Sequence, residues 1–444
     1  MELQIPPHSN DLDEELRRVY LALRTVFSPQ QQHQTTEWWT QRQLADRYLT
    51  SFQGTSASWM ICDRILQEKN ASNNDANAQM EQQQRQFFAA QTLHTKCRIS
   101  IEELPPDALP MLRESLLHHL QRFVMTMRNQ SDEALVTRLA MCISALAVQM
   151  EWTTIVNDLL NPEHQTPSSR MVSMTILRAL PEECASDRLI LVDDTSRFKM
   201  RDHLVSSALL MFTFLQESME QQGQAARILK TFHIWIRYVP IQPDSLLTST
   251  LLPWAVQAMT QSEFLEAASD VVVEILRMYP SHHYGNETLV QRLIPSLSQL
   301  PLDAALQSDN EDVMRAYCRV VTEMGESYMS LILLSHNRPP LPLRTNEALQ
   351  LVEAVLKCSS IPNSEIAGIT LHFWYRLVSE MESLEPYEWR QTVIDTYAPF
   401  LLQLIQACAS CLMRYPEDYD EMADDMVADL QRHRHYVEIG RAHV

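Results

Sequence analysis

The spacing of apolar residues constrains the fold of this chain more than any other feature of its sequence. Along nearly the whole chain, apolar residues recur every three or four positions. Residues 132–150 show the pattern with Leu135, Leu139, Ile143, Leu146 and Met150, and residues 263–279 and 313–334 repeat it. Apolar residues at this spacing form one stripe along an α-helix, whereas a half-buried strand needs strict alternation. No segment alternates for long enough to form a sheet, so the sequence predicts an all-α fold.

Prolines divide this helical pattern into segments of helix length. The proline ring clashes with the preceding turn, so a helix usually ends at or before it. The dividing residues are Pro105, Pro106, Pro162, Pro167, Pro181, Pro240, Pro280, Pro301, Pro339, Pro340, Pro362 and Pro386. Ser28-Pro29-Gln30-Gln31 combines a capping side chain with a proline at the first helical position, and so predicts a helix start. Expected helices include 29–52, 77–98, 131–149, 168–180, 196–221, 243–261, 311–335 and 363–382.

Helices of this kind are expected to pair into hairpins. The second helix of each pair has an apolar centre, and these centres return at steps of roughly 40 to 55 residues, slightly long for a helical repeat. A single hairpin cannot bury its own apolar face, but a stack of hairpins buries it against the next. The sequence therefore predicts an α-solenoid of stacked antiparallel helix hairpins, similar to HEAT or armadillo repeats. An ordinary helical protein of three domains is the alternative.

Glycine is scarce, with 6 among 444 residues, and this argues against several enzyme classes. Phosphate-binding loops and nucleophile elbows require glycine at fixed positions, and the patterns G-x-x-x-x-G-K-[ST], G-x-G-x-x-G and G-x-S-x-G are all absent. We therefore expect no enzymatic activity and no cofactor.

The chain is acidic, with 36 basic and 56 acidic residues and a formal net charge of −20. Such a charge repels a phosphate backbone, so we expect no direct nucleic-acid ligand and favour basic partners. Residues 1–9 lack the basic and apolar regions of a secretory signal. The uncharged stretches 245–262 and 396–413 approach spanning length, but each contains proline and glutamine. They are more typical of buried solenoid helices than of membrane spans.

Cysteine, histidine and tryptophan give no clear site. Cys408-x-x-Cys411 is the one C-x-x-C pair and lies within an apolar helical run, which favours core packing over metal or redox chemistry. His118-His119 and His282-His283 are adjacent pairs instead of the i, i+4 pairs of metal sites, so we expect surface positions and no metal. Most tryptophans lie on apolar stripes and are expected in the core, although an exposed one would suit a partner contact. They are Trp38, Trp39, Trp59, Trp235, Trp254, Trp374 and Trp389.

Two segments resemble a known family. Residues 59–66 read W-M-I-C-D-R-I-L, and residues 87–96 read F-F-A-A-Q-T-L-H-T-K. Both resemble the second hairpin of the importin-β N-terminal domain, with its pattern W-x-I-x-D-x-[IL]-L followed by FFAAQTL-x-x-K. Further segments, spread over about residues 15–437, are similar to the transportin-SR (transportin-3) group of this family, which imports serine/arginine-rich splicing factors. These segments are 103–105, 112–117, 180–183, 266–270, 317–319 and 373–377.

The resemblance implies a HEAT-repeat karyopherin that binds cargo in the cytoplasm and releases it in the nucleus when Ran-GTP binds. Expected partners are Ran-GTP, basic or arginine/serine-rich cargo, and nucleoporins, with shuttling between cytoplasm and nucleus. In the family, the Ran surface begins on the inner helices of the first hairpins, here about 31–52, 77–98 and 131–149. We select Gln91, Lys96 and Arg98 as exposed polar contacts for Ran. A Ran-independent HEAT-repeat scaffold for protein complexes is the alternative function.

Two acidic patches are candidates for contacts with basic partners, because an acidic surface attracts arginine-rich cargo and basic patches on Ran. They comprise Asp309, Glu311 and Asp312, and Glu417, Asp418, Asp420, Glu421, Asp424 and Asp425. Solvated loops between hairpins are an equally good interpretation of both patches.

The expected organisation follows from the same resemblance. Residues 1–10 form a flexible N-terminus, 11–149 the hairpins that bind Ran, and 150–437 further HEAT-like or exportin-1-like repeats. Family members are roughly twice as long, and residues 438–444 do not continue the apolar stripe. We therefore expect a truncated N-terminal half whose last residues are a non-native tail.

Overall fold

The computed structural model describes much of the chain in helical segments. The described residues are 11–27, 36–68, 76–127, 130–161, 166–190, 194–219, 223–334, 345–409, 419, 422–428 and 430–432. Within these ranges the regular structure is helical and no strand is present, which confirms the predicted fold class. The predictions for residues 1–10, for 438–444 and for a helix start at Pro29 lie outside these ranges.

The chain divides into two compact units, residues 1–211 and 212–444, which we call unit 1 and unit 2. The boundary expected at residue 149 falls between α6 and α7, within unit 1. The helices of unit 1 are α1 (Leu12–Phe27), α2 (Thr36–Gln53), α3 (Ala57–Leu66), α4 (Ala76–Ile99), η1 (Ile101–Glu103), α5 (Ala108–Thr126), α6 (Gln130–Gln149), α7 (Ile155–Leu159), α8 (Pro167–Ala185) and α9 (Thr195–Ser206). Helix α10 (Ala208–Ser218) spans the boundary.

The helices of unit 2 follow the same pattern of long and short elements. They are α11 (Ala225–Tyr238), α12 (Pro243–Thr248), α13 (Leu251–Ala258), α14 (Leu265–Met278), α15 (Glu287–Ser298), α16 (Leu302–Leu306), α17 (Glu311–Ser327), α18 (Met329–Leu334), α19 (Thr345–Ser359), α20 (Ser364–Gly368), α21 (Leu371–Glu382) and α22 (Tyr387–Ala407).

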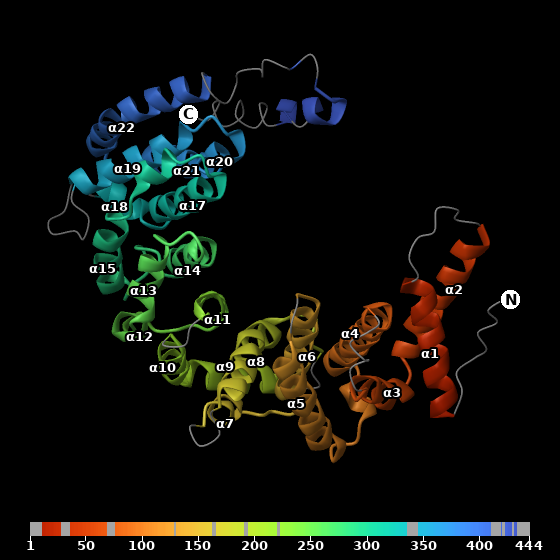
Figure 1. Ribbon diagram of the computed structural model, residues 1–444. Helices are drawn as coiled ribbons and strands as arrows, with labels where there is room; N and C mark the ends of the chain where they lie inside the picture. The colour runs from red at the N-terminus through yellow and green to blue at the C-terminus, as the bar shows by residue number, and fades with distance from the viewer. Residues whose placement is uncertain are drawn as a thin grey trace. The chain divides into compact units, whose positions relative to one another are not determined.

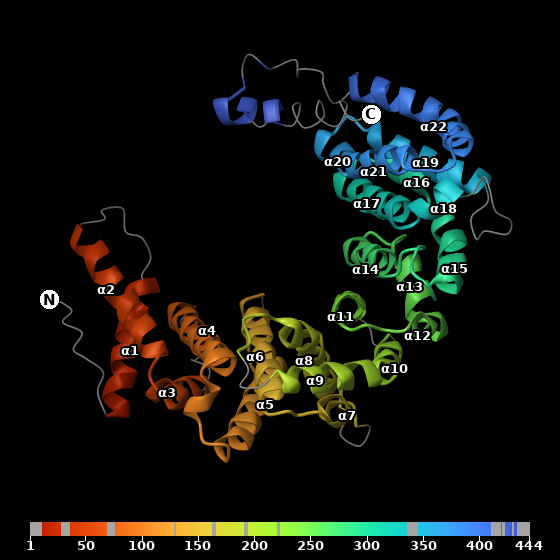
Figure 2. The same ribbon diagram turned by 180° about the vertical axis from the view of Figure 1, so that it is seen from behind.

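Unit 1 is a stack of helix hairpins. Helix α3 packs on α4, and α5 packs on α6. The second helices of successive hairpins, α4, α6 and α8, lie side by side in that order (Figures 1 and 2). Small residues at their contacts, including Ala89, Ala90 and Ala140, are fully buried. Each apolar stripe is therefore covered by its own hairpin partner and by the next hairpin, as expected for a solenoid.

Unit 2 repeats this arrangement. Helices α11, α14 and α17 contact one another in sequence, α13 packs on α14, and α16 packs on α17 (Figure 1). Further along, α19 packs on α17 and on α22, and α21 packs on α17 and α22. Trp235 of α11 and Trp374 of α21 are among the largest buried side chains, which confirms the prediction that they are core residues. Trp39 of α2 is 45% exposed, so the same prediction is wrong for it.

Four of the expected helices are each divided in two. The segment 196–221 breaks at Ser207, 243–261 at residues 249–250, 311–335 at Tyr328, and 363–382 at residues 369–370. At two of these breaks a hydroxyl hydrogen-bonds the backbone: Ser249 Oγ accepts from the Leu251 N–H at 3.1 Å, and Thr370 Oγ1 donates to the Ala367 carbonyl at 2.8 Å. Such bonds compete with the helical ladder. The apolar stripe continues across each break, so periodicity alone did not reveal it.

Pro181 does not end its helix, contrary to prediction. Helix α8 continues through it to Ala185. A proline inside a helix removes one hydrogen bond and costs about 3 kcal/mol. Beyond Pro181, however, Glu183 and Cys184 are buried, and Glu183 bonds to residues of α4. We infer that these tertiary contacts outweigh the local cost of the proline.

Gly325 of α17 fits against Phe373, and this contact gives a first prediction. A Cβ at residue 325 would lie 2.8 Å from the buried Phe373 ring. Overpacking costs about 1–3 kcal/mol, and the better helix propensity of alanine returns about 1 kcal/mol. We therefore expect Gly325→Ala to lower the free energy of unfolding of unit 2 by about 1 kcal/mol in urea denaturation.

The matched control is Gly368→Ala at the end of α20, where a Cβ would meet no atom within 4 Å. That variant should be as stable as the wild type or more stable. If both alanine variants shifted the urea midpoint equally, the Phe373 contact would not be the cause.

Candidate partner-binding surface

The three residues selected for Ran binding, Gln91, Lys96 and Arg98, all lie on α4. This helix packs on α3 through one side and on α6 through another. It therefore buries a wide arc of its surface, including the polar residues Thr92 and His94. The polar residues of α4 are thus divided between interior and surface, and their positions along the helix do not reveal which is which.

Lys96 is a buried packing residue, and the prediction that it is exposed is wrong. Only 2% of its surface is accessible. Its ammonium group donates to Glu103 Oε2 at 2.7 Å and to the backbone carbonyls of Thr55 and Gln53 at 3.0 and 3.4 Å. The Nζ atom also lies 5.2 Å from the centre of the Trp59 ring. Lys96 therefore ties α4 to the turn before α3, and burial of its charge is tolerated because every donor has an acceptor.

Arg98 is mostly buried, and Gln91 is half-buried. The guanidinium of Arg98 donates twice to Glu183 of α8, from Nε at 2.9 Å and from NH2 at 2.6 Å. The side chain of Arg98 keeps 16% exposure, so it reaches the surface only in part. The structure thus gives Arg98 a structural partner, and the role of Gln91 and Arg98 in binding Ran stays a prediction.

Glu183 is the centre of a polar network that joins three hairpins. Its side chain is fully buried, and besides Arg98 it binds His94 Nε2 of α4 at 3.1 Å. The other ring nitrogen, His94 Nδ1, lies 3.2 Å from Arg138 NH1 of α6. Burial acts to raise the pKa of Glu183, but the hydrogen bonds from His94 and Arg98 hold it below its ordinary value. Burial lowers the pKa of His94, so its ring is neutral at pH 7, and Nε2 donates while Nδ1 accepts.

The first acidic patch, Asp309, Glu311 and Asp312, is exposed at the start of α17. Asn310 caps this helix, and its Oδ1 accepts from the Asp312 N–H at 2.9 Å. Carboxylates at a helix N-terminus are stabilised by the unpaired N–H groups of the first turn. Their position therefore has a local structural reason, and contact with a basic partner stays a prediction.

The second patch is described only in part. Asp424 and Asp425 are exposed in a short helical segment at 424–428. Glu417, Asp418, Asp420 and Glu421 lie outside the described residues.

Unit 2 contains a row of charged contacts that the sequence reasoning missed. It joins α11, α14, α17 and α21, helix to helix. The pairs are His233–Glu274 at 3.6 Å, Arg277–Glu323 at 2.9 Å, Arg319–Asp270 at 2.8 Å and His372–Glu326 at 2.8 Å. On both α14 and α17 the charged residues are spaced i, i+4, i+7, which places them on one helix face. That spacing of charged residues, repeated in residues 270–277 and 319–326, is the feature of the sequence from which this row could have been predicted.

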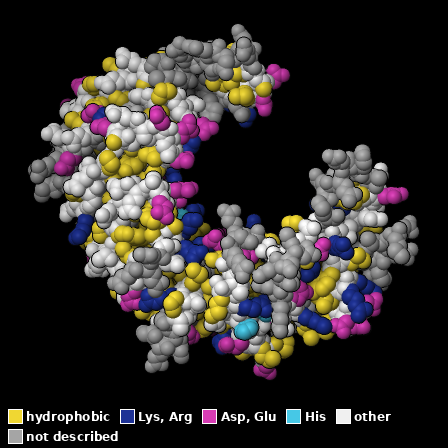
Figure 3. Space-filling view, viewed as in Figure 1, with side chains coloured by type: hydrophobic (Ala, Val, Ile, Leu, Met, Phe, Trp, Pro, Cys, Tyr) yellow, Lys and Arg dark blue, Asp and Glu magenta, His cyan; other side chains and the backbone are white. Residues whose placement is uncertain are grey.

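The acidic excess is larger in unit 2. Residues 1–211 contain 20 basic and 26 acidic side chains, whereas residues 212–444 contain 16 and 30. Figure 3 shows Asp and Glu side chains along the edge of unit 2 over α14, α17 and α20, and Lys and Arg side chains over α1, α3 and α5 of unit 1. A positively charged partner is therefore attracted more strongly to unit 2 than to unit 1.

Ser115, His119 and Asp63 come together between α3 and α5 but do not form a catalytic relay. Ser115 Oγ donates to Asp63 Oδ1 at 2.5 Å, and His119 Nε2 binds the same oxygen at 2.9 Å. In a Ser-His-Asp triad the carboxylate holds the opposite ring nitrogen from the serine. Here His119 Nδ1 has no hydrogen-bond partner in the described part of the chain. His119 is only 1% exposed, so the predicted surface position is wrong for this residue.

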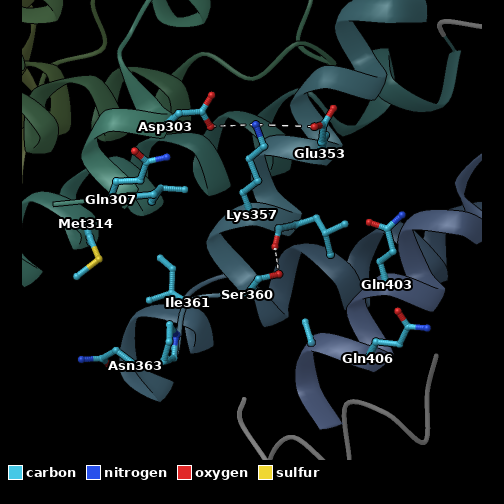
Figure 4. Close-up of a pocket in the computed structure, with 14 residues that line it drawn as sticks. Asp303, Gln307, Met314, Glu353, Lys357, Ser360, Ile361, Asn363, Gln403 and Gln406 are labelled. Atoms are coloured by element: carbon cyan, nitrogen blue, oxygen red, sulfur yellow. Dashed lines mark hydrogen bonds and ion pairs between the residues drawn. The ribbon is translucent and has the colours of Figure 1, made fainter. Parts of the chain in front are cut away.

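A pocket of about 980 Å³ opens in unit 2 between α16, α17, α19 and α22 (Figure 4). Its floor includes Met314 and Leu306, which pack against the core cluster of Cys318, Cys358, Ile361 and Ile366. Its rim carries the amides of Gln307, Gln403 and Gln406. Lys357 is neutralised by Asp303 at 2.9 Å and Glu353 at 3.8 Å. The pocket therefore combines an apolar floor with a polar rim.

The cysteines that the structure describes are buried thiols. Cys408 of the C-x-x-C pair is among them, and Cys411 lies outside the described residues. In the described ranges, no three His, Cys, Asp or Glu side chains lie close enough together to hold a metal ion. Within the same ranges, none of the helices combines the length and the apolarity needed to cross a bilayer.

Comparison with known proteins gives two family matches. The model of exportin 1-like proteins matches residues 132–272, and that of the second TPR domain of transportin-3 and importin-13 matches residues 309–410. Transportin MOS14 of Arabidopsis thaliana is 25% identical over 417 residues, which cover 90% of this chain and 41% of that protein. Importin-13 of Bos taurus is 24% identical over 387 residues, 82% of this chain and 37% of that protein.

A solved structure described as importin-13 in its cytosolic state has a TM-score of 0.62 and 16% sequence identity. The superposition covers 80% of this chain and 41% of the other. The chain therefore has the same helical fold, and it spans about two fifths of the length of the curated relatives that it matches.

Proposed function

The chain belongs to the importin-β superfamily, and from this premise we propose that it acts as a nuclear transport receptor that binds Ran-GTP and protein cargo. The observation that supports this most directly is the similarity to a transportin and to importin-13 along 90% and 82% of the chain. The solenoid provides the physical means, because a row of hairpins offers a long surface whose curvature changes through small shifts at each contact.

For Ran we propose the second helices of the first hairpins, within 31–52, 77–98 and 131–149, as the surface. The corresponding elements are α2, α4 and α6. Gln91 and the exposed part of Arg98 are the proposed contacts, whereas Lys96 acts through packing because its ammonium group is already occupied. A contact surface on α4 and α6 is supported by their extensive mutual packing, which holds the side chains of both helices in fixed positions.

For cargo we propose a basic segment, with arginine/serine-rich splicing factors as the class that the family resemblance suggests. The exposed patch of Asp309, Glu311 and Asp312 lies on unit 2, which carries the larger acidic excess. Arginine binds carboxylates with two parallel hydrogen bonds, so neighbouring exposed carboxylates suit an arginine-rich chain. We further propose nucleoporins as partners and shuttling between cytoplasm and nucleus, with no cofactor, nucleic-acid ligand or membrane attachment required.

The decisive measurement is a titration of the full chain with Ran loaded with GTP or with GDP. We expect affinity for the GTP form to exceed that for the GDP form by at least about 100-fold, or about 2.7 kcal/mol. Gln91→Lys should weaken the GTP complex about tenfold, because it places a new charge in the contact. The control, Gln391→Lys on exposed α22 of unit 2, should leave the affinity unchanged.

Equal affinity for the two nucleotide states, or no binding to either, would remove the receptor proposal. A stable complex with protein partners that Ran-GTP does not dissociate would instead favour a Ran-independent scaffold.

A further inference from the structure

Unit 1 carries a cationic site on its row of second helices, formed by Phe87 of α4, Thr137 and Arg138 of α6, and Arg178 of α8. We call these four residues the arginine surface. The Arg138 guanidinium carbon lies 5.9 Å from the centre of the Phe87 ring, and Arg178 NH2 donates to Thr137 Oγ1 at 3.2 Å. These two contacts link α6 to α4 and to α8 through adjacent residues of α6, and all four side chains are half-buried or exposed.

Arg138 has no anionic partner in direct contact among the described residues, although the buried Glu183 attracts it at longer range. Its NH1 group donates to the neutral ring of His94, and in the described part of the chain no carboxylate lies within 4.0 Å of its guanidinium. The nearest candidate, Glu183, is fully buried and already accepts from Arg98 and His94. Burial, together with the charge of Arg98, lowers the pKa of Arg138. An arginine in this position gains from an external anion, because within the described residues only its NH1 group is hydrogen-bonded.

The surroundings determine the kind of anion. Phe87 is 38% exposed, and Met141, one turn along α6 from Arg138, is half-buried, so apolar contact area lies beside the charge. Arginine, aromatic residues and methionine are enriched at protein interfaces. The combination favours a carboxylate carried by a peptide with an adjacent apolar residue.

We propose that the arginine surface binds an acidic segment of a partner protein, with one carboxylate held by Arg138 and a neighbouring apolar side chain packed on Phe87. This site differs in sign from the acidic patches of unit 2. It shares α4 and α6 with the surface proposed for Ran, so its binding is measured without Ran. Arg178 adds attraction at longer range while it keeps its bond to Thr137.

The test uses the full chain and two fluorescein-labelled peptides. The first has the sequence Glu-Glu-Phe-Glu-Glu, and the second has glutamine in place of each glutamate. Fluorescence anisotropy at about 50 mM salt should show saturable binding of the glutamate peptide and at least about tenfold weaker binding of the glutamine peptide. Arg138→Gln should weaken the glutamate peptide about tenfold, and Arg138→Lys less, because lysine keeps the charge but not the paired donors.

Two further variants separate binding from folding. Thr137→Glu leaves both arginines in place and supplies a carboxylate beside them, so it should abolish binding by occupying the site. Arg47→Gln removes an exposed arginine of α2 and should leave binding unchanged. The proposal is overturned if neither peptide binds, if both bind equally, or if Thr137→Glu and Arg138→Gln bind the glutamate peptide as the wild type does. If Arg47→Gln weakened peptide binding as much as Arg138→Gln, the binding would reflect the general charge of the surface, and the proposal would also be overturned.

Discussion

Replacing Glu183 by alanine is expected to lower the free energy of unfolding of unit 1 by about 3–5 kcal/mol, the usual cost of removing one partner from a buried ion pair. Glu183 is fully buried and accepts hydrogen bonds from Arg98 and His94. Without it, the Arg98 guanidinium would stay mostly buried with no counter-charge, and His94 would lose its acceptor. The loss should be large because the network joins α4 to α8 and, through Arg138, to α6.

Hydrogen exchange of the full chain measures this effect directly. In Glu183→Ala, amide protection should fall in α4, α6 and α8 together. The neighbouring Glu182 is exposed on the same helix, so Glu182→Ala is the matched control and should change stability by less than about 0.5 kcal/mol. Equal protection in the two variants would show that the network does not join the hairpins.

The pH dependence provides a second readout of the same network. The folded pKa of Glu183 lies below its unfolded value of about 4.3, so its contribution is fully present above that pH and is lost as pH falls through the folded pKa. The amide protection of unit 1 in the wild type should therefore fall below about pH 4.3. The share of this fall that comes from protonation of Glu183 should be absent from Glu183→Ala.

Trp374→Ala should have a comparable effect in unit 2. The indole is 1% exposed, and its Nε1 donates to Ser359 Oγ of α19 at 2.8 Å. Its removal leaves a cavity between α19 and α21, and Ser359 Oγ keeps only its bonds to the Val355 carbonyl and Thr370 Oγ1. Truncation of a buried tryptophan typically costs about 3–5 kcal/mol. We expect the urea midpoint of unit 2 to fall accordingly, with the loss of exchange protection concentrated in α17, α19 and α21.

The adjacent residue provides the control. Tyr375 is 50% exposed on the same helix, so Tyr375→Ala should shift stability by no more than about 0.5 kcal/mol. Trp374→Phe retains most of the volume but not the donor, and should lie between alanine and wild type. If Trp374→Ala were as stable as Tyr375→Ala, the packing of α21 on α19 would not support unit 2.

Both predictions concern contacts between hairpins, and these contacts also bear on the proposed carrier function. A solenoid changes its curvature by small adjustments at each hairpin contact. The Glu183 network fixes one such set of contacts in unit 1, and the charged row of α11, α14, α17 and α21 fixes another in unit 2. We therefore expect Glu183→Ala to weaken Ran binding as well, through the position of α4, even though Glu183 is inaccessible to a partner.

The sequence determined the helical class, the hairpin stack and the family resemblance. Helix periodicity is a local property, because residues three and four apart share a face whatever the rest of the chain does. The stripe 135–150 therefore predicts α6 correctly from residues within that helix. Excess acidity is equally independent of the fold, since it follows from composition alone.

Only the tertiary structure decided which polar residues face solvent. Lys96 and Gln91 both lie on α4, yet Lys96 is buried because Glu103 and the turn carbonyls at residues 53 and 55 surround it. Arg98 and Glu183 are 85 positions apart and meet only because hairpins stack. The continuation of α8 past Pro181 has the same origin. Burying a charge or placing a proline inside a helix costs free energy locally. Whether other contacts offset that cost depends on groups that the fold brings together from distant parts of the chain.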